Sequence, residues 1–236
     1  MLADNQNVVQ TGGIGQDVHP PSMSKIAIVD FIAQELPRWR DDPERRSESS
    51  ETILTSQLCS YLNASTRRSN VWSHIQFQAE VGDETKTGRK IDLAAQPSET
   101  LWIEQRRHSK YDIIFPIECK RLPTPNGTNR DEREYVINAK TTGGLQRFKF
   151  GYHAASHNFA AMIAYVQVEG FLYWVNKINE WIRDLSRVCN SQWNELDLLQ
   201  VLENGSNHDL YVLNSCHQRV NIEFHLDLRH LWIKMY

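Results

Sequence analysis

Residues 115–122, FPIECKRL, constrain the fold of this chain most, because they alternate with the period of a β-strand and end in charge. The apolar side chains of the alternation would point into a core: Phe115, Ile117 and Cys119. Glu118 and Lys120 would then share the opposite, exposed edge. We expect an acid and a base side by side on a sheet, with Cys119 as a packing residue rather than a nucleophile.

Helical and strand-like patterns are interleaved along the rest of the chain. Apolar residues recur at helical spacing in four segments, at 24–40, 50–63, 135–150 and 169–188. Strand-like runs lie between and after them, at 71–81, 89–95, 100–105, 111–120, 160–168, 208–215 and 220–233. This order predicts an α/β domain with a layered arrangement of helices and sheet.

The bulk composition favours one globular domain and restricts its setting. The chain has 236 residues, of which 40% are hydrophobic and 23% charged, so we expect a single domain over 24–236 after a flexible tail at 1–23. The formal charge of −3 requires any nucleic-acid contact to come from a local basic patch. Four scattered cysteines without a CxxC pair, and no apolar run of roughly 20 residues, indicate a reduced cytoplasmic protein without a membrane role.

A second strand repeats the pattern of the first. In residues 89–95, RKIDLAA, Ile91 and Leu93 would face the core while Asp92 faces the other side. Asp92 and Glu118 would thus present two carboxylates from different strands, a suitable seat for Mg²⁺. Lys120 would hold or polarise an attacking water, an arrangement that suits hydrolysis of a phosphodiester bond.

These residues carry a resemblance. Asp92 followed by Glu118-Cys119-Lys120 resembles the D…(D/E)xK signature of the PD-(D/E)xK, or restriction-endonuclease-like, nuclease superfamily. The wider context, FPIECKRL with YVINAKTTGGLQRFKFGYH and AAMIAYV, resembles nuclease-like proteins found among bacterial mobile-element and phage-defence genes. The similarity covers about residues 50–170, and Ile91 stands where the family name puts proline. It implies a restriction-endonuclease-like core, with a central mixed sheet flanked by helices, and a C-terminal elaboration.

The resemblance also implies roles for individual residues. Asp92 and Glu118 would bind Mg²⁺ or Mn²⁺, and Lys120 would be the catalytic lysine. Many members add a glutamate from the preceding helix, which makes Glu51 the candidate third ligand and Glu80 its substitute. Glu51 also has a purely structural explanation, because an acid in the first turn of a helix stabilises the helix dipole.

Basic residues follow the candidate site in sequence. Arg121, Arg147 and Lys149 would bind phosphates if they line one face, and Arg147 is the best candidate because QRF belongs to the resembling segment. Runs of charge are by default solvated surface. The histidines lack zinc or HNH spacing, so we expect surface or packing roles for them.

The sequence therefore predicts a metal-dependent nuclease, with DNA favoured over RNA as substrate and bacterial anti-phage defence implied by the resemblance alone. Two alternatives remain: a catalytically silent module of the same fold that binds nucleic acid or a partner protein, and an RNA-directed effector nuclease. The sequence shows no helix-turn-helix and no nucleotide-binding loop, so we expect a separate sensor or ATPase partner. A homodimer is left open.

Overall fold

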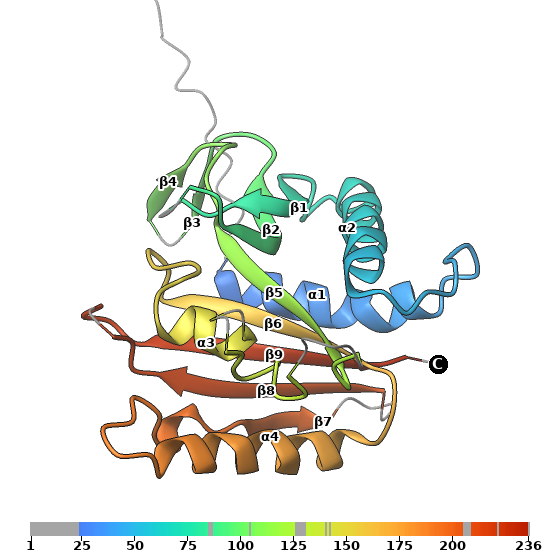
Figure 1. Ribbon diagram of the computed structural model, residues 1–236. Coiled ribbons are helices and arrows are strands. Elements are labelled where there is room, and N and C mark those ends of the chain that lie inside the picture. Colours follow the sequence, from blue (N-terminus) through green and yellow to red (C-terminus); the bar gives the residue numbers. More distant parts are fainter. Residues whose placement is uncertain are drawn as a thin grey trace, which may run out of the picture.

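The computed structural model describes residues 24–235 except 85, 86, 104, 126–130, 140, 142, 205–208 and 221. The predicted tail at 1–23 lies outside the described residues. Helices and strands are interleaved along the chain, as the hydrophobic patterns predict (Figure 1). In chain order the elements are α1 (Lys25–Arg40), α2 (Glu51–Arg68), β1 (Ile75–Gly82), β2 (Lys90–Pro97), β3 (Leu101–Ile103), β4 (Arg106–His108), β5 (Phe115–Leu122), α3 (Gly144–Lys149), β6 (Phe159–Val166), α4 (Phe171–Ser186), the short 3₁₀ helix η1 (Glu195–Asp197), β7 (Gln200–Asn204), β8 (Leu210–His217) and β9 (Leu226–Lys234).

A mixed seven-stranded sheet, in the order β1-β2-β5-β6-β9-β8-β7, forms the centre of the molecule. Strand β2 runs antiparallel to its neighbours β1 and β5, strand β6 runs parallel to its neighbours β5 and β9, and strand β8 runs antiparallel to its neighbours β9 and β7. The small β3–β4 hairpin forms a separate two-stranded sheet. The expected α/β architecture with a central mixed sheet is therefore confirmed.

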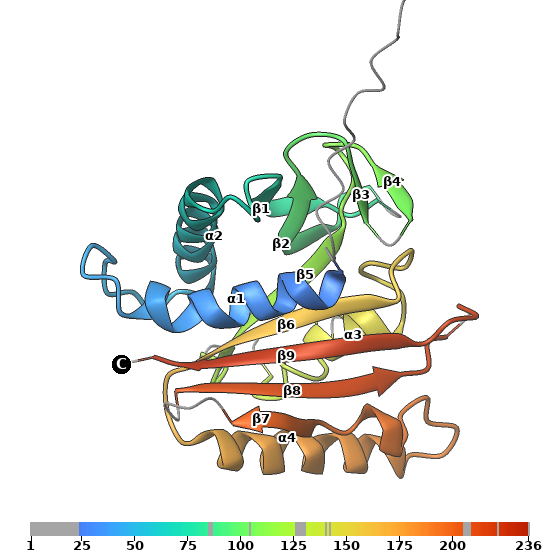
Figure 2. The same ribbon diagram turned by 180° about the vertical axis from the view of Figure 1, so that it is seen from behind.

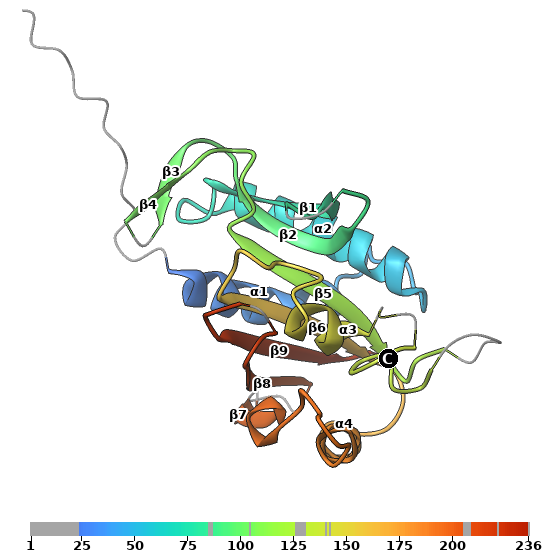
Figure 3. The same ribbon diagram turned by 60° about the vertical axis from the view of Figure 1, so that its left-hand side comes forward.

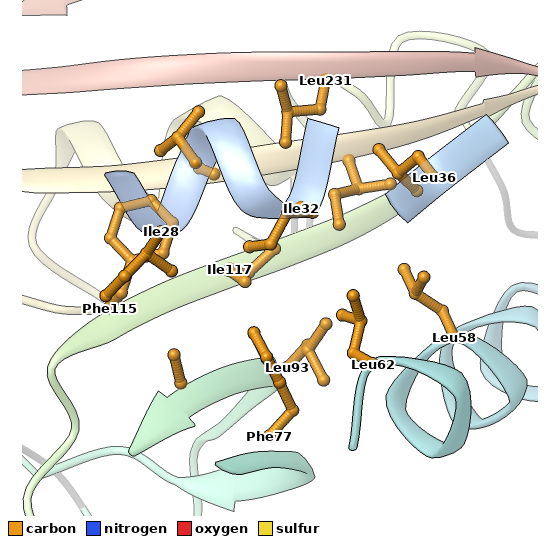
Figure 4. Packing of buried hydrophobic residues seen from close by; sticks show 14 of the residues in the cluster. Ile28, Ile32, Leu36, Leu58, Leu62, Phe77, Leu93, Phe115, Ile117 and Leu231 are labelled. Carbon is orange, nitrogen blue, oxygen red and sulfur yellow. The ribbon is translucent and has the colours of Figure 1, made fainter. Parts of the chain in front are cut away.

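Helices cover both faces of the sheet, and each face has its own hydrophobic core. One core joins α1 and α2 to the inward side chains of β2, β5 and β6. Figure 4 shows how Ile28 and Ile32 of α1 and Leu62 of α2 meet Leu93 and Ile117 of the strands. The other core joins α3 and α4 to the opposite face (Figures 2 and 3). Successive residues of β5 and β6 thus belong to different layers, as strand geometry requires.

Helix α3 is much shorter than the pattern over 135–150 predicts, because the segment before Gly143 forms turns rather than helix. Two glycines let these turns press against the start of α3. A Cβ on Gly143 would lie 2.4 Å from the Ile137 Cα, and a Cβ on Gly144 would lie 2.9 Å from the Tyr135 carbonyl oxygen. Helix α3 therefore begins at Gly144, where the backbone contacts Tyr135 and Ile137 of the preceding turns.

The C-terminal half adds two further differences from expectation. The edge strand β7 was not predicted, since it follows a short 3₁₀ helix without a clear alternation. The helical spacing over 169–188 also does not bury every apolar side chain of α4, since Leu172 is 62% exposed whereas Trp174 is buried. None of the described helices combines the length and apolarity needed to cross a membrane.

Candidate active site

The charged end of β5 is buried, which corrects the expectation that Glu118 and Lys120 lie on an exposed edge. Phe115, Ile117 and Cys119 pack into the core under α1 and α2, as predicted. Glu118 and Lys120 occupy the other face, but Glu118 is 0% exposed and Lys120 is 5% exposed. Helix α3 and the turn after it supply groups that contact Glu118. Buried charges of this kind need partners, so their contacts are informative.

The carboxylates of Asp92 and Glu51 lie beside β5, where β2 and β5 are no longer paired. The ladder between these strands covers three residue pairs and stops before Asp92. Beyond it, two backbone N–H groups of β5 bind carboxylates instead of a strand. Cys119 N–H donates to Asp92 Oδ2 at 2.9 Å, and Arg121 N–H donates to Glu51 Oε2 at 3.0 Å. Unpaired strand donors thus fix both acids beside β5.

The ammonium of Lys120 lies among three carboxylates. Its Nζ is 2.8 Å from Glu118 Oε1, 3.4 Å from Glu51 Oε1 and 3.6 Å from Asp92 Oδ2. It also donates to the Cys119 carbonyl at 2.9 Å. The residues expected to act together are therefore brought together in space, although Asp92 and Glu118 are 26 positions apart in the chain.

The electrostatics of this cluster are uneven. Burial and the neighbouring Glu118 carboxylate raise the pKa of Asp92 from 3.8 to about 6. Burial alone would raise the pKa of Glu118, yet Lys120, His153 and Arg147 outweigh it and hold that pKa well below its usual range. Burial opposes the charge on Lys120, but the surrounding carboxylates raise its pKa well above the usual value. Lys120 and the Cys119 N–H thus compensate the charge of Asp92 only in part.

Two site residues come from the α3 region. Arg147 Nη1 donates to Glu118 Oε1 at 2.5 Å, so this arginine belongs to the carboxylate cluster. His153, expected to be a surface or packing residue, is 3% exposed and its Nδ1 lies 3.3 Å from Glu118 Oε2. Neither of those two atoms makes a well-formed hydrogen bond. The sequence carried no spacing signal for His153, because a turn after α3 brings it to the site.

Of the three basic residues expected to bind phosphate, the structure excludes one. Lys149 is fully buried and donates to Asp197 Oδ1 at 2.8 Å, so it cannot contact nucleic acid. Arg121 is partly exposed and its guanidinium donates to the Ser49 carbonyl. Arg147 is 22% exposed beside Glu118. Helical spacing explains the error, since Lys149 lies on the opposite side of α3 from the solvent.

The partner of Lys149 belongs to a buried chain of hydrogen bonds through the C-terminal strands. Lys149 and the imidazole of His217 both contact Asp197, and the chain continues through Ser215 and His230 to Tyr135. Trp232 completes it by donating to the Tyr135 hydroxyl at 2.9 Å. Burial lowers the pKa of both histidines, consistent with neutral rings that each donate one bond and accept one. These hydrogen bonds connect Tyr135 and Lys149, which flank Arg147 in the sequence, to strands β8 and β9.

A pocket of about 300 Å³ opens beside the cluster, lined among others by Glu51, Thr55, Glu80 and Asp92. Glu80, the expected substitute for Glu51, lines this pocket but forms an ion pair with Lys90 at 2.8 Å, with both side chains more than half exposed. Glu51 is therefore the glutamate that reaches the lysine of the cluster. Asp92 connects the cluster to the pocket.

Asp92 and Glu118 offer carboxylate oxygens, the type of ligand that a divalent cation prefers in proteins. Mg²⁺ uses one or two protein carboxylates and completes its shell with water and substrate phosphate. Asp92 has a 29% exposed side chain, and Glu118 Oε2 is buried without a hydrogen bond. Within the described residues, no three His, Cys, Asp or Glu side chains form a group that could hold a metal ion. Glu51, expected as a third ligand, instead uses its two oxygens on Lys120 and Arg121.

No family model, no curated protein and no solved structure matches this chain.

Proposed function

We propose that this protein is a metal-dependent nuclease that hydrolyses phosphodiester bonds, with DNA favoured over RNA. The observation that carries the proposal is the convergence of Glu118, Asp92 and Glu51 on the Lys120 ammonium, at the point where β2 and β5 separate. The order of helix, acid-bearing strand, lysine-bearing strand, helix and parallel strand supports a restriction-endonuclease-like core. Bacterial anti-phage defence, with a separate sensor or ATPase as partner, is the setting that the sequence resemblance implies.

The proposal gives the residues of the cluster separate tasks. Asp92 and Glu118 are the proposed ligands of Mg²⁺ or Mn²⁺, which when bound would lower the pKa of a water and offset charge on the scissile phosphate. Lys120 places a cation where charge develops in the transition state. Glu51 orients the Lys120 ammonium, and Arg147 restrains the Glu118 carboxylate from the other side.

The burial of Glu118 and Lys120 favours a catalytic role for them over that of a solvated surface ion pair. Exposed ion pairs contribute little to stability. Here Glu118 and Lys120 are both removed from water, and burying several charges together is costly unless they are paired. Three carboxylates face two permanent cations, Lys120 and Arg147, which leaves one negative charge uncompensated when all the acids are ionised. A divalent cation would complement that excess.

The test is cleavage by the purified protein. Plasmid DNA, single-stranded DNA and RNA are incubated with Mg²⁺, Mn²⁺ or EDTA, and the assays are repeated with Glu118→Ala and Lys120→Ala. We expect metal-dependent cleavage by the wild type and none by either variant. Cleavage that persists in EDTA, or in both variants, would sink the assignment. Binding of nucleic acid without cleavage under any condition would favour the catalytically silent module.

A further inference from the structure

A second pocket also reaches Asp92 but differs in charge from the first. Its volume is about 390 Å³, and Arg89, Lys90 and Arg147 lie in its walls. Among its described lining residues Asp92 is the only acid, whereas the described lining of the first pocket has three acids and no cation. Asp92 therefore has an acidic pocket and a basic pocket as neighbours. A polyanion is favoured on the basic side.

Arg89 is held in place by neutral groups. Its carbonyl accepts the Asp83 N–H at 2.9 Å, which closes the turn between β1 and β2. Its Nη1 donates to the Tyr152 carbonyl at 2.9 Å, and its guanidinium lies 4.7 Å from the centre of the Tyr152 ring. The aromatic face and the carbonyl orient the planar guanidinium without neutralising it.

The charge of Arg89 is the free one of the three. Lys90 forms its ion pair with Glu80, and Arg147 forms its own with Glu118. Arg89 contacts no carboxylate in the part of the chain that the structure describes. A fixed guanidinium without an acid partner at the wall of a pocket suits bidentate binding of a phosphate.

We propose that Arg89 binds a backbone phosphate of the nucleic-acid strand, next to the phosphate that is cleaved; this rests on the proposed function of the Asp92 site. Arg89 precedes Asp92 by three residues, which is about 10 Å along an extended strand. That separation places the bound phosphate beyond the reacting one. Tyr152, fixed in the turn after α3, is a positioning residue for the guanidinium.

The experiment measures binding without catalysis. The full chain is titrated into a fluorescein-labelled DNA single strand of about 12 nucleotides in EDTA, and anisotropy is recorded at several salt concentrations. Arg89→Gln is expected to weaken binding roughly tenfold and to reduce the salt slope by about one. Arg89→Lys keeps the charge, so its affinity for the strand should lie between those of the wild type and Arg89→Gln. Arg187→Gln, which removes an exposed arginine directly after α4, should bind like the wild type.

The outcomes separate this proposal from the nuclease assignment. Binding that depends on Arg89 in a protein that never cleaves supports the phosphate site and overturns the nuclease. Cleavage by wild type with equal binding by Arg89→Gln and Arg187→Gln overturns the phosphate site alone. Inorganic phosphate is tested as a competitor: if it binds through Arg89 while the strand binds independently of Arg89, the pocket is a free-phosphate site and the proposal is wrong. Thermal melting of each variant confirms that it is folded.

Discussion

Asp92 is expected to destabilise the folded protein at neutral pH, so replacing it with asparagine should stabilise the chain. Burial and the Glu118 carboxylate raise the pKa of Asp92 from 3.8 to about 6. A shift of that size corresponds to an unfolding free-energy difference on the order of 3 kcal/mol. Asparagine has nearly the same shape, carries no charge, and can still accept the Cys119 N–H bond that Asp92 accepts.

The pH dependence identifies the cause. Because the folded-state pKa of Asp92 lies above the unfolded value, ionisation costs the folded protein stability progressively as pH rises from 3.8 to about 6. Above that window the full penalty applies, and below it the penalty disappears. The unfolding free energy of Asp92→Asn should therefore exceed that of the wild type by the full penalty near pH 8 and by almost nothing near pH 4.

Urea denaturation in EDTA at several pH values measures the difference in unfolding free energy between Asp92→Asn and the wild type. In a thermal melt near pH 8, the same difference corresponds to a rise in melting temperature of roughly 6–12 °C for a chain of this size. Asp184→Asn, an exposed acid on α4, is the matched control and should change stability by less than about 0.5 kcal/mol. An Asp92→Asn variant that is no more stable than the wild type near pH 8, or equally stabilised at all pH values, would refute the reasoning.

Three further predictions concern the buried charges. Glu118→Gln leaves two cations short of their shared counter-ion and should cost about 3 kcal/mol in urea denaturation; an unchanged midpoint would contradict the ion-pair account. Lys149→Met should lower stability by about 3 kcal/mol through loss of the Asp197 contact but leave DNA anisotropy unchanged, and weaker DNA binding by a folded variant would restore this lysine as a contact. In the asparagine variant above, stability should fall as pH drops below about 6.5, since burial lowers the folded-state pKa of His217 and His230 and the unfolded rings gain protons first; a flat profile would contradict their neutral state.

Alternation along single strands made the central part of the site predictable. Phe115, Ile117 and Cys119 lie in the core where period-two geometry puts them, so Glu118 and Lys120 had to share the other face. Two neighbouring strands with the same pattern then brought their acids to one side of one sheet. These features depend on local backbone geometry, which a sequence reveals well.

The parts that could not be predicted depend on contacts between distant segments. Arg147 and His153 reach Glu118 because the turns around α3 fold over β5, and no periodic pattern encodes that path. Lys149 appeared to be a surface cation because its partner Asp197 lies 48 residues away in the chain. The burial of Glu118 likewise depends on α3 and the turn after it, which cover β5, rather than on the sequence of β5 itself.

The proposed role of the acid–lysine cluster is tested most directly by single-turnover cleavage of labelled DNA, with and without Mg²⁺, using a matched pair of lysine variants. Lys120→Met removes the cation at the centre of the carboxylates, and Lys177→Met removes a partly exposed lysine of α4 that pairs with Glu180. We expect Mg²⁺-dependent cleavage that Lys120→Met slows by a factor of about 100 or more and that Lys177→Met leaves unchanged. Equal rates for the two variants, or rates that do not depend on the metal, would contradict the account.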